Sequence, residues 1–173
     1  IAGIKLCAAL RKQYNFDSIC LMPTNLYGEG DNYHLTDSHV LPALIRKFYE
    51  AKINNSEYVE CWGSGEPLRE FLHVDDLGDA VVFCLENWEP NDVNAPKDLY
   101  GNSLNHLNVG TGKDISIKQL AKKIADYSGF KGEIRWDNSK PDGTPKKQLD
   151  ISKITKLGWL PKIKLDDGIK QTI

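Results

Sequence analysis

The segment Arg69-Glu70-Phe71-Leu72-His73-Val74-Asp75-Asp76 changes from the pattern of a strand to that of a helix. Residues 69–74 form an extended piece, and Asp75 is of a residue type that commonly caps a helix N-terminus. The helix that follows should bury apolar side chains at helical spacing, namely Leu77, Ala80, Val81, Cys84 and Leu85. A strand that leads directly into an amphipathic helix is typical of α/β proteins.

The same alternation of strands and helices continues on both sides of this segment. Short apolar runs predict strands at 18–22, 58–62, 106–109 and 133–136, the first of them buried on both faces. Helices are expected over residues 1–10, from close to His39, and from Ser116 to Gly129, with two short helical pieces near the end. Residues 24–38 and 140–147 should be loops, and 87–105 should be a surface insertion. The strands are few for a complete doubly wound sheet.

Composition restricts the class of protein. The chain has 173 residues, of which 27% are charged and 40% hydrophobic, with a formal net charge of -2. This balance does not favour nucleic acid as a partner. No apolar run approaches the roughly 18 residues that a membrane span needs, so no membrane association is expected. The four cysteines are widely scattered, which fits reduced thiols in a cytoplasmic protein.

Common catalytic motifs do not occur in the sequence. No Gly-x-Gly-x-x-Gly fingerprint follows a strand, and no Gly-x-Ser-x-Gly elbow, Walker lysine or His-Glu-x-x-His zinc motif is found. Gly110-Thr111-Gly112 is short for a phosphate-binding loop. A strand-to-helix turn is the favoured interpretation of this tripeptide, with phosphate binding as the alternative.

Four collinear segments resemble the carboxyl-terminal half of the GDP-L-fucose synthase family, whose members are extended short-chain dehydrogenases/reductases. The segments are 22–44, which begins Met-Pro-Thr-Asn-Leu-Tyr-Gly, then 62–76, 108–112 and 140–147, the last reading Lys-Pro-Asp-Gly-Thr-Pro-Lys-Lys. The Arg-x-Phe-x-His-Val-x-Asp core is shared by many sugar-nucleotide epimerases and dehydratases. Residues 31–39 and the Lys-Pro-Asp-Gly-Thr-Pro sequence are more particular to the family.

The resemblance implies an α/β fold that holds the end of an incomplete Rossmann-type sheet. In the family, Ile1 would directly follow the lysine of a Tyr-x-x-x-Lys dyad, so the chain is expected to lack the amino-terminal NADP-binding half. Residues 1–28 would be remaining Rossmann elements, and residues 29–173 would form a single substrate-binding region. The dyad helix packs against a second subunit in the family, which implies a homodimer with residues 1–13 in its interface.

The resemblance also implies a reaction and residues that perform it. The family converts GDP-4-keto-6-deoxy-mannose to GDP-L-fucose by epimerisation at C3 and C5 and reduction at C4 with NADPH. A histidine suits the proton exchange because its ordinary pKa lies near neutrality. His39 matches the family's catalytic histidine and cofactor contact. Pro23, Thr24, Asn25 and Leu26 match the segment that lines the nicotinamide, and Lys47, Trp62, Arg69 and Asp142 match substrate-binding positions.

Each of these residues also has a structural interpretation. His39 could be an ordinary histidine at a helix start, and Pro-Thr-Asn a simple turn. Trp62 could belong to the core, Lys47 to a solvated helix face, and Asp142 to an Asp-Gly turn. His73 lies in a predicted strand and should be a buried polar side chain with its hydrogen bonds satisfied.

Two rival functions remain open at this point. One is another sugar-nucleotide enzyme, such as a 4-epimerase or 4,6-dehydratase, which would share Arg69 and Asp75 but would not need His39. The other is a non-catalytic binding module.

Overall fold

The structure is a computed structural model, and it describes residues 1–34 and 37–173. Its helices are α1 (Ala2–Tyr14), α2 (Val40–Ile53), α3 (Val74–Asn87), α4 (Ile117–Ser128), α5 (Ser152–Leu157) and α6 (Leu165–Thr172). Its strands are β1 (Cys20–Pro23), β2 (Asn25–Tyr27), β3 (Tyr58–Trp62), β4 (Leu68–His73), β5 (His106–Val109), β6 (Asp114–Ser116), β7 (Glu133–Asp137) and β8 (Lys146–Lys147). The α/β expectation is confirmed.

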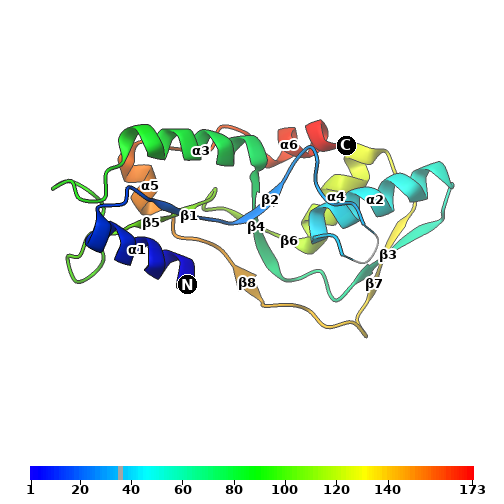
Figure 1. Cartoon of the computed structure of the whole chain (residues 1–173). Coiled ribbons are helices and arrows are strands. Elements are labelled where there is room, and N and C mark those ends of the chain that lie inside the picture. Colours follow the sequence, from blue (N-terminus) through cyan, green and yellow to red (C-terminus); the bar gives the residue numbers. More distant parts are fainter. Residues whose placement is uncertain (35–36) are drawn as a thin grey trace.

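Among the described residues, the strands form three small sheets. β1 pairs with β5 and β3 pairs with β7, both in parallel. Between them, β4 pairs in parallel with β2 and β8 and antiparallel with β6. Figure 1 shows β1 and β5 at one end of the molecule with α1, α3 and α5, and β3 and β7 at the other end with α2 and α4.

The central strand β4 joins two hydrophobic cores. Successive side chains of a strand point to opposite faces, and accordingly Phe71 packs in the core formed around α2 and α4, while Leu72 packs in the core between α3 and β5. Both side chains are buried. The adjacent residues Arg69 and Glu70 are thereby held at the junction of the two ends.

The start of α3 differs from the sequence prediction. The N-cap is His73 rather than Asp75, and Nδ1 of His73 accepts a hydrogen bond from the amide of Asp75 at 3.3 Å. An imidazole nitrogen can therefore take the role that was assigned to a carboxylate. His73 is itself buried, as the sequence predicted for a satisfied polar side chain.

The predicted apolar stripe of α3 is wrong at two positions. Ala80 and Cys84 are fully buried and Leu77 is partly buried, but Val81 is 39% and Leu85 is 69% exposed. Residues 77, 80 and 84 lie within about 60° of one another around the helix, and 81 and 85 lie about 40° and 80° beyond Leu77. The helix thus buries a narrower stripe than its sequence suggested.

Three further predictions about strands need correction. β1 is not buried on both faces, since Met22 is 43% exposed and Pro23 is exposed, and within the described residues this strand pairs only with β5. β2 lies inside the predicted loop 24–38, and β8 inside the predicted loop 140–147. Both are too short to show the alternation that reveals a strand. Residues 35–36 of the first loop lie outside the described part of the chain.

Other predicted elements are confirmed. α2 begins directly after His39 and accommodates Pro42 in its first turn, where the missing amide costs no helical hydrogen bond. Ser116 and Gln119 form the capping box of α4, and Gly129 ends that helix at φ 79°. Residues 88–105 contain only an isolated bridge between Lys97 and Ser103. No helix of the described residues is long and apolar enough to cross a membrane.

Candidate functional site

Two adjoining hollows lie where α2, β3, β4, β7 and α4 meet. The larger, of about 310 Å³, is lined by Ser38, Val40, Ala43, Leu44, Lys47, Cys61, Trp62, Ile117 and Trp136. The smaller, of about 180 Å³, is lined by Val40, Trp62, Gly65, Pro67, Arg69, Ile117 and Gly143. Three residues line both hollows, so the two form one continuous depression. It contains three of the four substrate-binding residues that the sequence predicted.

Trp62 provides a flat aromatic surface at the end of β3. The strand alternates, with Val59 and Cys61 buried, so Trp62 points outward and is 68% exposed. This exposure excludes the alternative that Trp62 belongs to the core. Two ammonium groups lie near its ring, with Lys47 Nζ at 5.6 Å and Lys140 Nζ at 5.7 Å from the ring centre. A flat ring flanked by two cations suits a planar base attached to an anion.

Lys47 extends from α2 toward β3. Its Nζ donates to the carbonyl of Glu60 at 2.9 Å, and the residue is partly buried. This hydrogen bond holds the ammonium group at the rim of the larger hollow. A freely solvated helix lysine would lack such a fixed position.

Arg69 lines the smaller hollow from β4. Its Nη1 donates to the carbonyls of Leu68 at 2.8 Å and Thr144 at 2.6 Å. Its Nη2 lies beside Gly143, where an added Cβ would come within 2.9 Å of that nitrogen. Arg69 therefore fixes the loop after β7 while it presents positive charge to the hollow.

Asp142 joins that loop to the turn after β3. Its Oδ1 accepts from the Ser64 amide at 2.8 Å, and its Oδ2 accepts from the Ser64 hydroxyl at 2.6 Å. These two bonds, that of the hydroxyl first, lower the pKa of the Asp142 carboxyl below its ordinary value. An added Cβ at Gly63 would overlap Oδ1, so a glycine is needed there for the close approach. The geometry gives Asp142 a role in shaping the loop.

His39 and residues 23–26 lie close to these elements. His39 is exposed, its side chain makes no capping hydrogen bond, and its neighbours Ser38 and Val40 line the larger hollow. Residues 23–26 run from the end of β1 into β2. The side chains of Thr24 and Asn25 both donate to the carbonyl of Glu70, at 3.2 and 2.7 Å. The segment is thereby attached to β4 next to Arg69.

Several residues of the depression were not predicted from the sequence. Trp136 and Cys61 are opposite each other in the parallel pairing of β7 with β3, which brings Trp136 into the larger hollow. Burial raises the pKa of the Cys61 thiol, and the nearby charge of Lys47 lowers it by a smaller amount. The thiol therefore stays neutral and lines the hollow as a small apolar group. Lys140 also belongs to the surroundings of the depression, because its Nζ lies over the ring of Trp62. Only the pairing of distant strands reveals these contacts.

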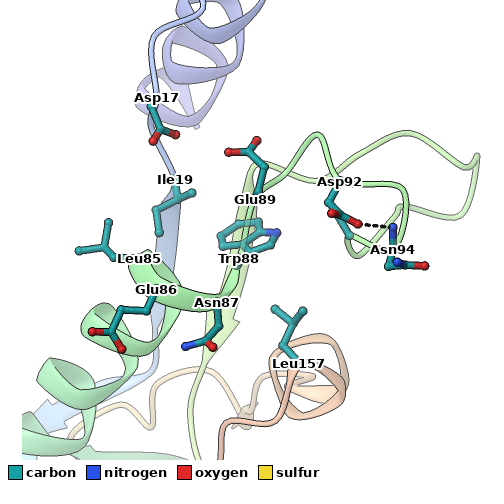
Figure 2. Close-up of a pocket in the computed structure, with 11 residues that line it drawn as sticks. Asp17, Ile19, Leu85, Glu86, Asn87, Trp88, Glu89, Asp92, Asn94 and Leu157 are labelled. Atoms are coloured by element: carbon teal, nitrogen blue, oxygen red, sulfur yellow. Dashed lines mark hydrogen bonds between the residues drawn. The ribbon is translucent and has the colours of Figure 1, made fainter.

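Another cavity, of about 470 Å³, lies at the opposite end of the molecule, where α3 ends. Its rim carries four acidic side chains, those of Asp17, Glu86, Glu89 and Asp92, while Trp88 and Leu157 contribute apolar surface (Figure 2). None of the predicted site residues lines it. The first depression, which carries Lys47, Trp62 and Arg69, is therefore the candidate site.

The fold and the candidate site together define an α/β protein with a cationic, aromatic depression suited to an anionic nucleotide. Residues 1–96 match the NAD dependent epimerase/dehydratase family. The chain belongs to that family. Its members are enzymes, and the family's description specifies a nicotinamide cofactor.

Individual relatives are similar over nearly the whole chain. The chain is 53% identical over 172 residues to a putative GDP-L-fucose synthase 2 of Arabidopsis thaliana, covering 99% of this chain and 48% of that protein. It is 47% identical to the GDP-L-fucose synthase of Escherichia coli, covering 99% and 52%. A solved GDP-6-OMe-4-keto-L-xylo-heptose reductase from C. jejuni has a TM-score of 0.86 at 37% identity, covering 99% and 57%. The chain thus spans about half the length of the relatives it matches.

The turn 110–112 is not free to hold a pyrophosphate. The amides of Thr111 and Gly112 donate to Oε1 of Glu70, at 2.6 and 2.8 Å, so they are not available to a pyrophosphate. This occupancy supports the turn interpretation of Gly110-Thr111-Gly112 over the phosphate-binding one. Residues 23–26, which follow a parallel strand, remain in a position where α/β sheets commonly bind ligands.

Proposed function

We propose that this chain is the substrate-side half of a GDP-L-fucose synthase. The complete enzyme would convert GDP-4-keto-6-deoxy-mannose into GDP-L-fucose through epimerisation at C3 and C5 and NADPH-dependent reduction at C4. The observation that carries the proposal is the 53% identity, over 172 residues, to a protein named as a putative enzyme of this activity. The depression around Trp62 supports it because its charge and shape suit a nucleoside diphosphate.

Within the depression, each residue type has a chemical task. Trp62 stacks on the guanine, since every base offers a π-face to an aromatic ring. Arg69 binds diphosphate oxygens through its guanidinium, which can make parallel hydrogen bonds, and Lys47 adds a second positive charge. Asp142 lies outside the lining of the depression and holds the loop through Ser64. We assign it a contact with the substrate as well.

His39 exchanges protons with the sugar. The C4 ketone acidifies the hydrogens on C3 and C5, so a base can remove a proton and an acid can return one to the opposite face. An exposed imidazole at the edge of the larger hollow is free to approach the sugar from α2. The protein thereby inverts both carbons without a change in oxidation state.

Residues 23–26 and His39 contact the nicotinamide end of NADPH. When bound, NADPH supplies the hydride that reduces C4, and the C4 oxygen takes up a proton. Thr24 and Asn25, anchored on the Glu70 carbonyl, hold their segment in a fixed place. The other parts of the cofactor would be bound by residues 1–28 together with an amino-terminal half, and residues 29–173 would form the substrate-binding region.

The same proposal includes a cytoplasmic homodimer. α1 buries none of its residues within the described chain, and Leu6 and Tyr14 are 59% and 73% exposed. Such apolar exposure on one helix is typical of a protein interface. The four cysteines are free, and burial raises the pKa of Cys84 to about 11, which keeps that thiol protonated in a cytoplasm near neutral pH.

Replacement of His39 in the full-length protein tests the function. We expect His39→Gln to stop the exchange of C3 and C5 protons with deuterated solvent, while NADPH binding persists. Proton NMR of the recovered sugar measures the exchange, and fluorescence of NADPH measures its binding. His106→Gln, a change in β5 away from the depression, is the matched control and should exchange normally. Normal exchange by His39→Gln would contradict the assignment.

The C. jejuni reductase raises a second candidate, reduction of a GDP-linked 4-keto sugar without epimerisation. The two activities differ in their products. With GDP-4-keto-6-deoxy-mannose in deuterated water, a synthase incorporates deuterium at C3 and C5 and yields GDP-L-fucose. A simple reductase incorporates none and leaves both carbons unchanged.

A further inference from the structure

Glu70 is a carboxylate without exposed surface at the middle of the molecule. Its Oε1 accepts from the amides of Thr111 at 2.6 Å and Gly112 at 2.8 Å, and its Oε2 accepts from the amide of Leu149 at 2.7 Å. In the described part of the chain, no ion pair joins it to a basic side chain. Burying a carboxylate is costly unless donors satisfy it, and here three backbone amides do so.

The backbone of Glu70 makes a second set of contacts. Its carbonyl accepts from the Thr24 hydroxyl at 3.2 Å and from the Asn25 side-chain amide at 2.7 Å. Leu149 lies two residues after β8, at the end of the segment 140–149 that carries Asp142. One residue therefore contacts both the segment proposed to line the nicotinamide and the end of the loop proposed to cover the substrate.

The sequence around the carboxylate is adapted to this contact. An added Cβ at Gly110 would overlap Oε1 of Glu70, so only glycine lets the turn come this close. On the same strand, the neighbouring Arg69 binds the carbonyl of Thr144 in the same loop. The loop is thus attached to β4 at two successive residues.

We infer that Glu70 is a positioning residue, which fixes residues 23–26, the turn 110–112 and the loop 140–149 relative to one another. It thereby sets the distance between a substrate bound at Arg69 and the segment that lines the nicotinamide. This inference rests on the proposed function. It assigns Glu70 no contact with the substrate.

Asp76 offers a matched comparison within the same chain. It is also buried, and its Oδ1 and Oδ2 accept from the backbone amides of Lys162 at 3.0 Å and Ile163 at 2.9 Å. It anchors the segment before α6, and in the described part of the chain none of its side-chain hydrogen bonds involves residues of the candidate site. Loss of either carboxylate should lower stability, but only loss of Glu70 should disturb the reaction geometry.

The test compares Glu70→Gln and Asp76→Asn in the full-length protein. In Glu70→Gln an NH₂ group replaces one oxygen and meets an amide donor, so the turn 110–112 and the loop end at Leu149 move relative to β4, while residues 23–26 stay on the backbone carbonyl. We expect the single-turnover rate of NADPH oxidation by GDP-4-keto-6-deoxy-mannose to fall about 10- to 100-fold, because a small misplacement of reacting groups lowers a rate by a factor of this order. The dissociation constants of NADPH and of GDP, measured in separate titrations, should change by a smaller factor than the rate. Asp76→Asn should melt at a lower temperature and keep the wild-type rate.

A second variant covers the case in which Glu70→Gln does not fold. Thr24→Val removes the hydroxyl that donates to the Glu70 carbonyl and keeps the side-chain volume, and it should lower the same rate by a smaller factor. A wild-type rate in folded Glu70→Gln, or in Thr24→Val when Glu70→Gln is unfolded, would overturn the inference. Equal rate losses in Glu70→Gln and Asp76→Asn would also overturn it. A wild-type protein that does not oxidise NADPH with this sugar contradicts the proposed function instead.

Discussion

At the scale of single residues, Trp62 combines exposure with two neighbouring cations. A large aromatic side chain is normally buried, yet Trp62 is 68% exposed and lies between two lysines. The position of the exposed ring between two cations supports the proposal that Trp62 stacks on the base of a nucleotide.

Replacement of Trp62 should therefore weaken nucleotide binding. Stacking of a base on an aromatic ring contributes roughly 1–3 kcal/mol, so Trp62→Ala should weaken GDP binding by the full-length protein about 5- to 150-fold. Isothermal titration calorimetry measures the change. Tyr100→Ala is the control, because Tyr100 is 90% exposed in the segment 88–105, outside the candidate site. If both variants bind GDP equally, Trp62 is not a stacking platform.

Asp142 gives a prediction about pH. Its pKa is lowered in the folded chain, chiefly by the Ser64 hydroxyl, so the hydrogen bonds to Ser64 stabilise the loop at and above the ordinary aspartate pKa of about 3.9. They are lost only as the pH falls through the lowered value. In Ser64→Ala the pKa of Asp142 should rise toward the ordinary value. An NMR titration of the Asp142 carboxyl carbon measures this, and an unchanged pKa in the variant would contradict the assignment.

At the scale of elements, local signals predicted most helices and the longer strands. The capping box of Ser116 and Gln119, the helix start close to His39 and the strand at 58–62 were all predicted from local patterns, and each is present. β2 and β8 were missed because they exist only through pairing with β4, which lies more than 40 residues from either. The cap of α3 was misplaced because an imidazole took the place of the expected carboxylate.

The capping box of α4 provides a test of stability at this scale. Ser116 Oγ accepts from the Gln119 amide at 3.1 Å, and its loss in Ser116→Ala should lower the free energy of unfolding by about 1 kcal/mol. Ser116→Gly should lower the free energy of unfolding by only a few tenths of about 1 kcal/mol, because glycine leaves the helix end accessible to water. Urea denaturation measures both. A smaller loss in the alanine variant than in the glycine variant would exclude the capping contribution.

At the scale of the whole molecule, the candidate site is a product of topology. Asp142 and Ser64 are 78 residues apart in sequence, and Trp136 reaches the depression only because β7 pairs with β3. Spacing along the chain carries no information about such contacts. The sequence predicted Lys47, Trp62, Arg69 and Asp142 as substrate-binding residues through resemblance to a family, whereas the positions of Lys140, Trp136 and Glu70 beside them required the fold.

The division of tasks within the molecule leads to a prediction for the 173-residue chain on its own. Its sequence lacks a glycine fingerprint, and the amides of the turn 110–112 are occupied by Glu70, so the isolated chain should not bind NADPH. The depression around Trp62 is built entirely from residues of this chain, so GDP should bind weakly, and Trp62→Ala should abolish that binding. Titrations followed by NADPH fluorescence and by calorimetry measure the two ligands. Tight NADPH binding would mean that these 173 residues form a complete cofactor site, and the assignment of the chain to the substrate side would then be wrong.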